Sequence, residues 1–208
     1  DAAGNLSTCV QTITGVDNVK PVITVPANAT VNCGGSSAPS ATGTATATDN
    51  CSAVTITYSD LTTGNILTRT WKATDAAGNN STGVQIITQG TTFSPVVTSV
   101  PASNIYTGGV ATNLYLGYGA QSTTLQVGSL PSSGSPYTYA WSGASVNKLN
   151  STISGAPVFT PSGFGYYTFY VTVTNKYGCS NSATISICVT DIRVVSSKEK
   201  EKEMEKAK

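Results

Sequence analysis

The sequence predicts an all-β protein made of tandem β-sandwiches. Short segments in which threonine alternates with apolar residues recur along the chain, and no segment has a helical period before the charged C-terminal tail. Ser, Thr and Gly make up more than a third of the 208 residues. Alternation with a period of two places every second side chain on one face of a strand. Several such strands indicate a β-sandwich, and the length allows two of about 100 residues each.

Residues 17–90 carry the pattern of the first sandwich. Leu67 to Ala73 alternates, with Trp71 and Ala73 on one face, and a turn with Gly78 and Asn79 follows. The strands expected here span residues 21–26, 29–33, 42–48, 54–58, 67–73 and 84–88. They are short and closely spaced, as in an all-β sandwich.

A second, tyrosine-rich sandwich is expected at residues 101–193, after a linker at 91–100. Tyr139 and Trp141 share one strand face, and Tyr167 and Phe169 share another. The strands expected here span residues 113–119, 122–127, 137–141, 167–174 and 183–189, with a hairpin turn at 175–178. The inward-facing aromatic residues are the predicted core anchors of this sandwich, as Trp71 is of the first.

An internal repeat relates residues 1–14 to residues 75–88. Both segments begin Asp-Ala-Ala-Gly-Asn and continue into a similar strand, at an offset of 74 residues. Residues 1–16 are therefore expected to be the last strand of a preceding copy in a longer array. Its expected partners are neighbouring repeats of the same chain, or an identical chain.

The charge distribution excludes several classes of protein. The chain has no histidine, and its four glutamates all lie in the last ten residues. Without the tail at 194–208, six aspartates balance six basic residues. Histidine-dependent catalysis and nucleic-acid binding by counterion release are therefore not expected. No apolar segment approaches the length of a membrane span, and the tail is expected to lie outside the fold.

Two groups of motifs resemble known families. Residues 49–51 (Asp-Asn-Cys) and 73–79 (Ala-Thr-Asp-Ala-Ala-Gly-Asn) resemble hyalin-repeat (HYR) modules. Residues 137–142 (Tyr-Thr-Tyr-Ala-Trp-Ser), with 165–175, resemble PKD-type modules. Both families are immunoglobulin-like sandwiches of extracellular proteins. In tandem they resemble the very large surface adhesins of gliding bacteria, which implies a cell-surface role in adhesion and no shared catalytic residues.

Five cysteines give the strongest chemical signal. Cys33 and Cys51 lie 18 residues apart around a Gly/Ser loop, and a bridge between them would add about 3 kcal/mol. We expect this disulfide, with two buried thiols as the alternative. Cys179 and Cys188 are separated by an extended strand that is too long for a direct bond. Cys188 is expected to pair outside residues 1–208 or to stay reduced, and Cys9 to have its partner in the preceding copy.

Two weaker candidate sites have ordinary structural explanations. Asp17, Asp49 and Asp75 can be calcium ligands, but aspartates at turns also cap their own backbone. The tyrosines outside the predicted core are candidates for stacking on sugar rings: Tyr106, Tyr118, Tyr166 and Tyr170. The prediction is therefore no resident metal and no cofactor.

The sequence predicts a non-catalytic, extracellular repeat segment of a bacterial surface protein, which acts as a rigid spacer or a filament-forming stalk. Two alternatives remain open. One is a carbohydrate-binding accessory module of a secreted enzyme, with surface glycans as partners. The other is a self-assembling filament subunit in which residues 1–15 complete a neighbouring chain.

Overall fold

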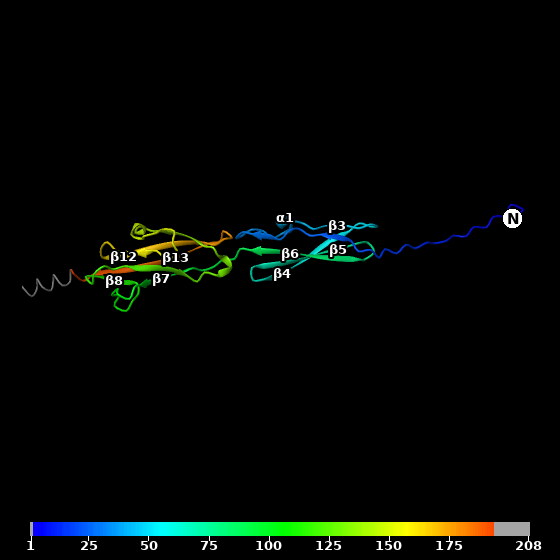
Figure 1. Cartoon of the computed structure of the whole chain (residues 1–208). Helices are drawn as coiled ribbons and strands as arrows, with labels where there is room; N and C mark the ends of the chain where they lie inside the picture. Colours follow the sequence, from blue (N-terminus) through cyan, green and yellow to red (C-terminus); the bar gives the residue numbers. More distant parts are fainter. Residues whose placement is uncertain (1, 194–208) are drawn as a thin grey trace, which may run out of the picture. The chain divides into compact units, whose positions relative to one another are not determined.

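The computed structural model describes residues 2–193, and these divide into two compact units. The first unit comprises residues 2–30 and 36–88, and the second comprises residues 31–35 and 89–193. Figure 1 follows the elements of each unit along the chain. Together they form an all-β protein of tandem β-sandwiches, as the sequence predicts. Among the described residues, no helix is long and apolar enough to cross a membrane.

The first unit is built from two sheets. One sheet pairs β1 (Val22–Thr24) with β3 (Thr46–Thr48). The other has the order β2–β6–β5–β4. Its strands are β2 (Ala29–Val31), β4 (Thr55–Thr63), β5 (Ile66–Thr74) and β6 (Asn80–Gln89), and the short helix α1 (Pro39–Thr42) precedes β3.

Strand β5 shows why this sequence makes a half-buried sheet. Its residues alternate, so that Leu67, Arg69, Trp71 and Ala73 are buried while the residues between them are more exposed. Antiparallel pairing with β4 and β6 fixes this register, since Trp71 lies opposite Tyr58 and Gly83. A slip of one residue would turn the apolar face outward, and the alternation therefore specifies the pairing.

The core of the first unit is partly polar, which the sequence did not predict. Arg69 has only 1% of its side chain exposed and contacts Asp60 through two hydrogen bonds of 2.8 Å. It also donates to Thr42 Oγ1 and to the carbonyl oxygen of Ser37. Gln85, which is fully buried, donates to the carbonyl oxygens of Ala27 and Thr42. These buried polar groups are paired, as a stable interior requires.

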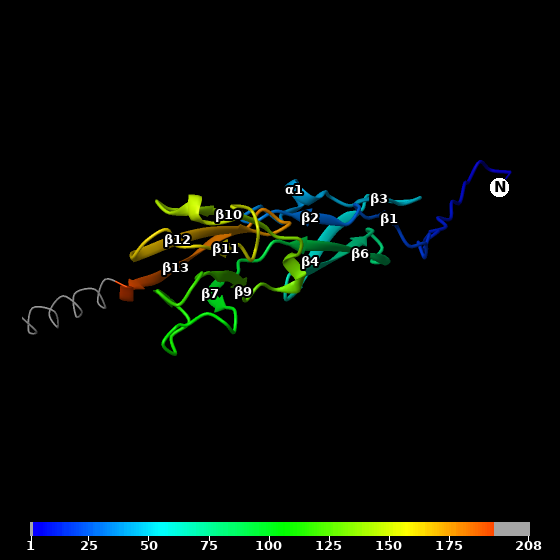
Figure 2. The same ribbon diagram turned by 60° about the vertical axis from the view of Figure 1, so that its left-hand side comes forward.

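The second unit is a sandwich of a four-stranded and a three-stranded sheet. The four-stranded sheet has the order β10–β12–β13–β8, with β8 parallel to β13. The three-stranded sheet has the order β11–β9–β7. Figure 2 labels most of these strands. They are β7 (Val96–Pro101), β8 (Asn113–Leu116), β9 (Thr123–Gly128), β10 (Thr138–Ser142), β11 (Val158–Phe159), β12 (Gly165–Thr174) and β13 (Ser180–Asp191).

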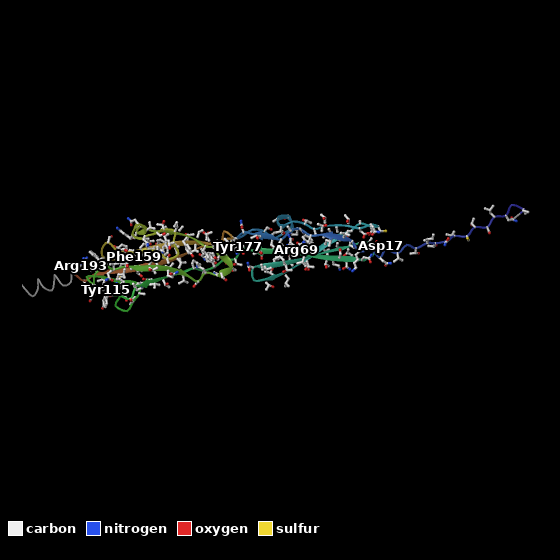
Figure 3. All side chains as sticks on the ribbon, viewed as in Figure 1. Asp17, Arg69, Tyr115, Phe159, Tyr177 and Arg193 are labelled. Carbon is white, nitrogen blue, oxygen red and sulfur yellow. A yellow bond between two sulfur atoms is a disulfide. The ribbon has the colours of Figure 1, made fainter. Side chains whose placement is uncertain are left out.

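The core of the second unit lies between these sheets and is mainly apolar, although Ser99, Thr123 and Asn175 are also buried. Trp141 and Phe169 are buried, with 6% and 0% exposure, while Tyr139 and Tyr167 are partly buried and pack against the same core. Phe159, labelled in Figure 3, contacts the rings of Tyr167 and Phe169 at centroid distances of 4.9 and 5.1 Å. In the first unit, Trp71 is 2% exposed.

The structure differs from the expected boundaries in two places. Residues 91–100 are not a free linker, because Phe93 is buried in the second unit's core and β7 begins at Val96. Residues 31–35 lie within the predicted first sandwich in sequence but belong to the second unit. The tail predicted at 194–208 lies outside the described residues.

Residues 5–16 are extended and are not part of any sheet. Leu6, Val10 and Ile13 are 89%, 93% and 83% exposed. In the homologous strand β6, the residues aligned with Gln11 and Ile13 are Gln85 and Ile87, and both are fully buried. The segment therefore has the sequence of a core strand but no sheet to complete.

Candidate functional site

The disulfide of the described residues joins Cys33 to Cys179, with a Cα–Cα distance of 5.0 Å. The expected bridge between Cys33 and Cys51 is wrong. Cys33 follows β2 in the segment that belongs to the second unit, and its amide donates to the carbonyl oxygen of Tyr177 at 3.0 Å. This hydrogen bond places its sulfur beside the turn between β12 and β13. Cys51 lies in an exposed loop of the first unit and carries a free thiol.

The other cysteines carry free thiols. Cys9 and Cys51 are exposed, and Cys188 is partly buried. Cys188 lies on β13, nine positions after Cys179, and the intervening strand keeps the two apart as the sequence indicates. The partners predicted for Cys9 and Cys188 would lie beyond residues 1–208 and stay predictions.

The Cys179 turn has a close counterpart in the first unit. The amide of Asp75 donates to the carbonyl oxygen of Asn79, and the amide of Asn79 donates back to the Asp75 side chain at 2.8 Å. In the second unit, Asn175 and Cys179 form the same pair of contacts, at 2.9 and 3.0 Å. The last residue of the turn is therefore the disulfide-bonded Cys179 in the second unit and Asn79, with its side-chain amide, in the first.

Three carboxylates converge at the corresponding turn of the first unit. Asp17 precedes β1, Asp49 follows β3, and Asp75 opens the turn between β5 and β6. One oxygen from each of these side chains lies within 4.8 Å of one from each of the others. Figure 3 labels Asp17 at the end of the unit from which the extended segment departs. We refer to Asp17, Asp49 and Asp75 as the aspartate cluster.

Each member of the aspartate cluster also caps local backbone. Asp17 Oδ1 accepts from the amide of Val19 at 3.0 Å, and Asp49 Oδ2 accepts from the amides of Cys51 and Ser52. The Asn79 side chain bridges the cluster, because its Nδ2 donates to Asp75 Oδ2 and to the Asp17 carbonyl oxygen. The turn-capping explanation is therefore correct for one oxygen of Asp17 and one of Asp49.

The remaining oxygens have no such partner. Asp17 Oδ2 and Asp49 Oδ1 are both buried from solvent and accept no hydrogen bond. Burial opposes ionisation of Asp75, but hydrogen bonds from Asn79 and from the Gly78 and Ala77 amides outweigh it and lower the pKa of this carboxyl group. The cluster thus holds an ionised carboxylate beside two unsatisfied oxygens, an arrangement able to bind a cation.

A group of three tyrosine rings lies on β8 and in the loops before and after it. The Tyr106 ring is 4.4 Å from that of Tyr118 and 5.3 Å from that of Tyr115, between centroids. Tyr106 and Tyr118 are 48% and 55% exposed. The structure thus brings together two of the four predicted ligand-contact tyrosines. It adds Tyr115, which the sequence placed within a strand.

The other two predicted tyrosines, Tyr166 and Tyr170, project from β12 with 81% and 49% exposure. Tyr166 borders an open, largely apolar groove of 390 Å³ that Phe164, Val189 and Asp191 also line. Asp191 forms an exposed ion pair with Arg193 at 2.8 Å. No described contact links this groove to the Tyr106–Tyr118 pair.

Comparisons with known proteins find similarity among solved structures only. No family model and no curated protein matches the chain. The crystal structure of Drosophila N-cadherin EC1–4 is 10% identical, covering 83% of this chain and 49% of that chain, with a TM-score of 0.46. Protocadherin gamma B7 domains 1–4 is 17% identical, covering 82% and 49%, with a TM-score of 0.38. Mouse cadherin-23 EC22–24 is 14% identical, covering 85% and 66%, with a TM-score of 0.39.

The chain spans about half the length of the N-cadherin and protocadherin structures. Its assignment as tandem β-sandwiches rests on the strand order and register of its own two units.

Proposed function

We propose that this chain is a non-catalytic, extracellular repeat segment of a large bacterial cell-surface protein. In this role it is a spacer or stalk in an adhesin built from HYR-like and PKD-like modules. Its contribution is structural: each sandwich adds a folded unit to an array, and other parts of the parent protein contact the target surface.

The observation that carries this proposal is a turn followed by a strand, which recurs along the chain. The Asp75 turn leads into β6, the Asn175 turn leads into β13, and residues 1–14 repeat the first of these in sequence. A closing turn and strand that recurs in successive modules is the mark of an array of similar units. Such arrays are extended by adding copies and need no new chemistry.

The disulfide supports the extracellular part of the proposal. Disulfides persist in oxidising compartments and are rare in the cytosol. The chain also has 10% charged residues and no histidine, and its solubility depends on hydroxyl groups. These features agree with a stable, secreted module more than with a cytosolic enzyme.

The proposal is tested by replacement within the parent surface protein. Residues 1–193 are exchanged for two unrelated β-sandwich modules of the same combined length, and adhesion of the cells is measured. A spacer role predicts that adhesion survives the exchange and decreases when the segment is deleted. Loss of adhesion after exchange, as complete as after deletion, would show that the segment itself binds the target.

A second candidate is carbohydrate binding, which the exposed Tyr106–Tyr118 pair favours. Neighbouring aromatic rings on a loop offer apolar faces on which a sugar ring can stack. Binding of the 208-residue protein to a glycan array, abolished by Tyr118→Ala and retained in the control Phe164→Ala, would support this function. If the protein binds no glycan on the array, or if Tyr118→Ala and Phe164→Ala bind glycans equally well, carbohydrate binding is rejected.

A further inference from the structure

We propose that Asp17, Asp49 and Asp75 form a calcium-binding site in the first unit. This inference is independent of the proposed spacer function, because it concerns the chemistry of one cluster and not the role of the parent protein.

The first argument is the unsatisfied bonding capacity of the cluster. Asp17 Oδ2 and Asp49 Oδ1 each expose less than 1 Å² to solvent and have no hydrogen-bond donor. A buried carboxylate oxygen without a donor is costly, and native interiors pair such atoms with a proton donor or a metal ion. The Asp75 side chain is itself only 6% exposed. Among the ion pairs of residues 2–193, none supplies a cation to this cluster.

The second argument is distance. Calcium binds oxygen ligands at about 2.3–2.6 Å, so two oxygens on one ion are separated by at most about 5 Å. The three carboxylates each offer an oxygen within 4.8 Å of the others, which meets this limit. Small side-chain movements would therefore bring an oxygen of each carboxylate to the calcium–oxygen distance from one ion.

The third argument is the chemistry of the ligands. The cluster offers carboxylate oxygens, and hard oxygen ligands select calcium or magnesium over zinc or copper. Magnesium requires a tighter, near-octahedral shell at about 2.0–2.1 Å, whereas calcium accepts irregular geometry with water completing the shell. Carboxylates from three separate segments, each already fixed by a backbone cap, favour the more tolerant ion.

The fourth argument comes from the equivalent turn of the second unit. There, Cys179 joins the turn covalently to Cys33. In the first unit, Asn79 holds that position and reaches only the Asp75 side chain and the Asp17 carbonyl oxygen. A calcium ion would join the segment before β1, the loop after β3 and the β5–β6 turn. It would supply the cross-link that the first unit lacks at this turn.

Isothermal titration of the metal-free, 208-residue protein with calcium chloride tests the site. Asp49→Asn and Asp17→Asn are the informative variants, because asparagine keeps an oxygen that can accept the local backbone bonds while it removes the charge. We expect binding with a Kd of about 10⁻³ M or tighter, as in extracellular calcium modules, and at least about tenfold weaker binding by each variant.

Asp191→Asn is the matched control, since it removes one aspartate charge from the second unit and is expected to bind calcium as the unaltered protein does. Thermal unfolding gives an independent readout that does not depend on whether a variant folds. In about 10 mM calcium, the melting temperature of the unaltered protein is expected to be several degrees higher than in chelator. Three results would overturn the proposal: absence of binding at about 10 mM calcium, binding by Asp49→Asn and Asp17→Asn as tight as by the unaltered protein, or the same melting temperature in chelator and in about 10 mM calcium.

Discussion

Removal of the Cys33–Cys179 disulfide is expected to destabilise the second unit strongly. The bond closes a loop of 146 residues. In the loop-closure model a 100-residue loop contributes about 4.7 kcal/mol, and the logarithmic dependence raises this to about 5 kcal/mol for the present loop. Because the dependence is logarithmic, the value changes little even if residues 36–88 stay folded within the loop. A loss of this size equals a large part of the stability of a typical domain.

The measurement is guanidinium unfolding of the double variant Cys33→Ser with Cys179→Ser, followed by tryptophan fluorescence. Both proteins also carry Trp71→Phe, so that Trp141, 6% exposed in the second unit's core, is the single reporter. Cys51→Ser, which alters an exposed free thiol, is the control and is expected to change the free energy of unfolding by less than about 0.5 kcal/mol. Equal effects of the double variant and the control, or peptide mapping that finds Cys33 bonded to Cys51, would refute the assignment.

Three further predictions concern the first unit. Asp60→Asn is expected to cost about 1–2 kcal/mol at pH 7, less than a fully buried pair because Asp60 is 30% exposed, and urea unfolding measures it. The hydrogen bond from Arg69 lowers the pKa of Asp60 against the opposing effect of burial. The pair therefore stabilises fully above pH of about 4, and its contribution decreases as acid protonates Asp60. A variant deficit that does not decrease as the pH is lowered from about 4 would contradict this. Gly83→Ala is expected to cost about 1–3 kcal/mol, because the added Cβ would overlap the Val25 side chain and force it to move, and an unchanged melting temperature would contradict this. Deletion of residues 1–14 is expected to leave both melting temperatures unchanged, whereas loss of oligomers in light scattering after this deletion would favour strand donation.

The strands of both units could be predicted because their alternation is local. In β5 and β12 every second residue faces the core, and a period of two identifies the buried face without knowledge of the partner strand. Trp71, Trp141 and Phe169 are buried where the pattern places them. The boundary between the two sandwiches was harder to predict. Strand β7 begins after Pro95 in a stretch of Ser, Thr and Val, a composition that fits a linker equally well.

The disulfide could not be predicted, because pairing depends on which unit each cysteine joins. Cys33 and Cys51 flank a single loop, and loop closure favours a bond between near neighbours. The structure assigns residues 31–35 to the second unit, and no local pattern in the sequence indicates that exchange. A comparison of the Asp75 and Asn175 turns gives a partial signal, since Cys179 stands where the first copy has Asn79.

The polar core of the first unit was also missed, for a related reason. Arg69 lies at a buried position of an alternating strand, where alternation alone expects an apolar residue. Its tolerance there depends on Asp60, opposite it on β4, and on two oxygens from the region of α1. The register of the β4–β5 hairpin indicates that the Asp60 carboxylate lies opposite Arg69. The oxygens of Ser37 and Thr42 lie about 30 residues earlier in the chain, so only the folded structure identifies them as partners of Arg69.

Residues 31–35 have a consequence for how such modules are inherited. A recombination event that transferred only residues 91–193 would transfer Cys179 without its disulfide partner Cys33. The second sandwich would also lack residues 31–35, which belong to it. Adjacent copies are therefore expected to be duplicated or exchanged as pairs, with the two cysteine codons kept in step across the join. The same reasoning sets the limits for laboratory dissection: a fragment meant to reproduce the second sandwich has to begin upstream of Val31.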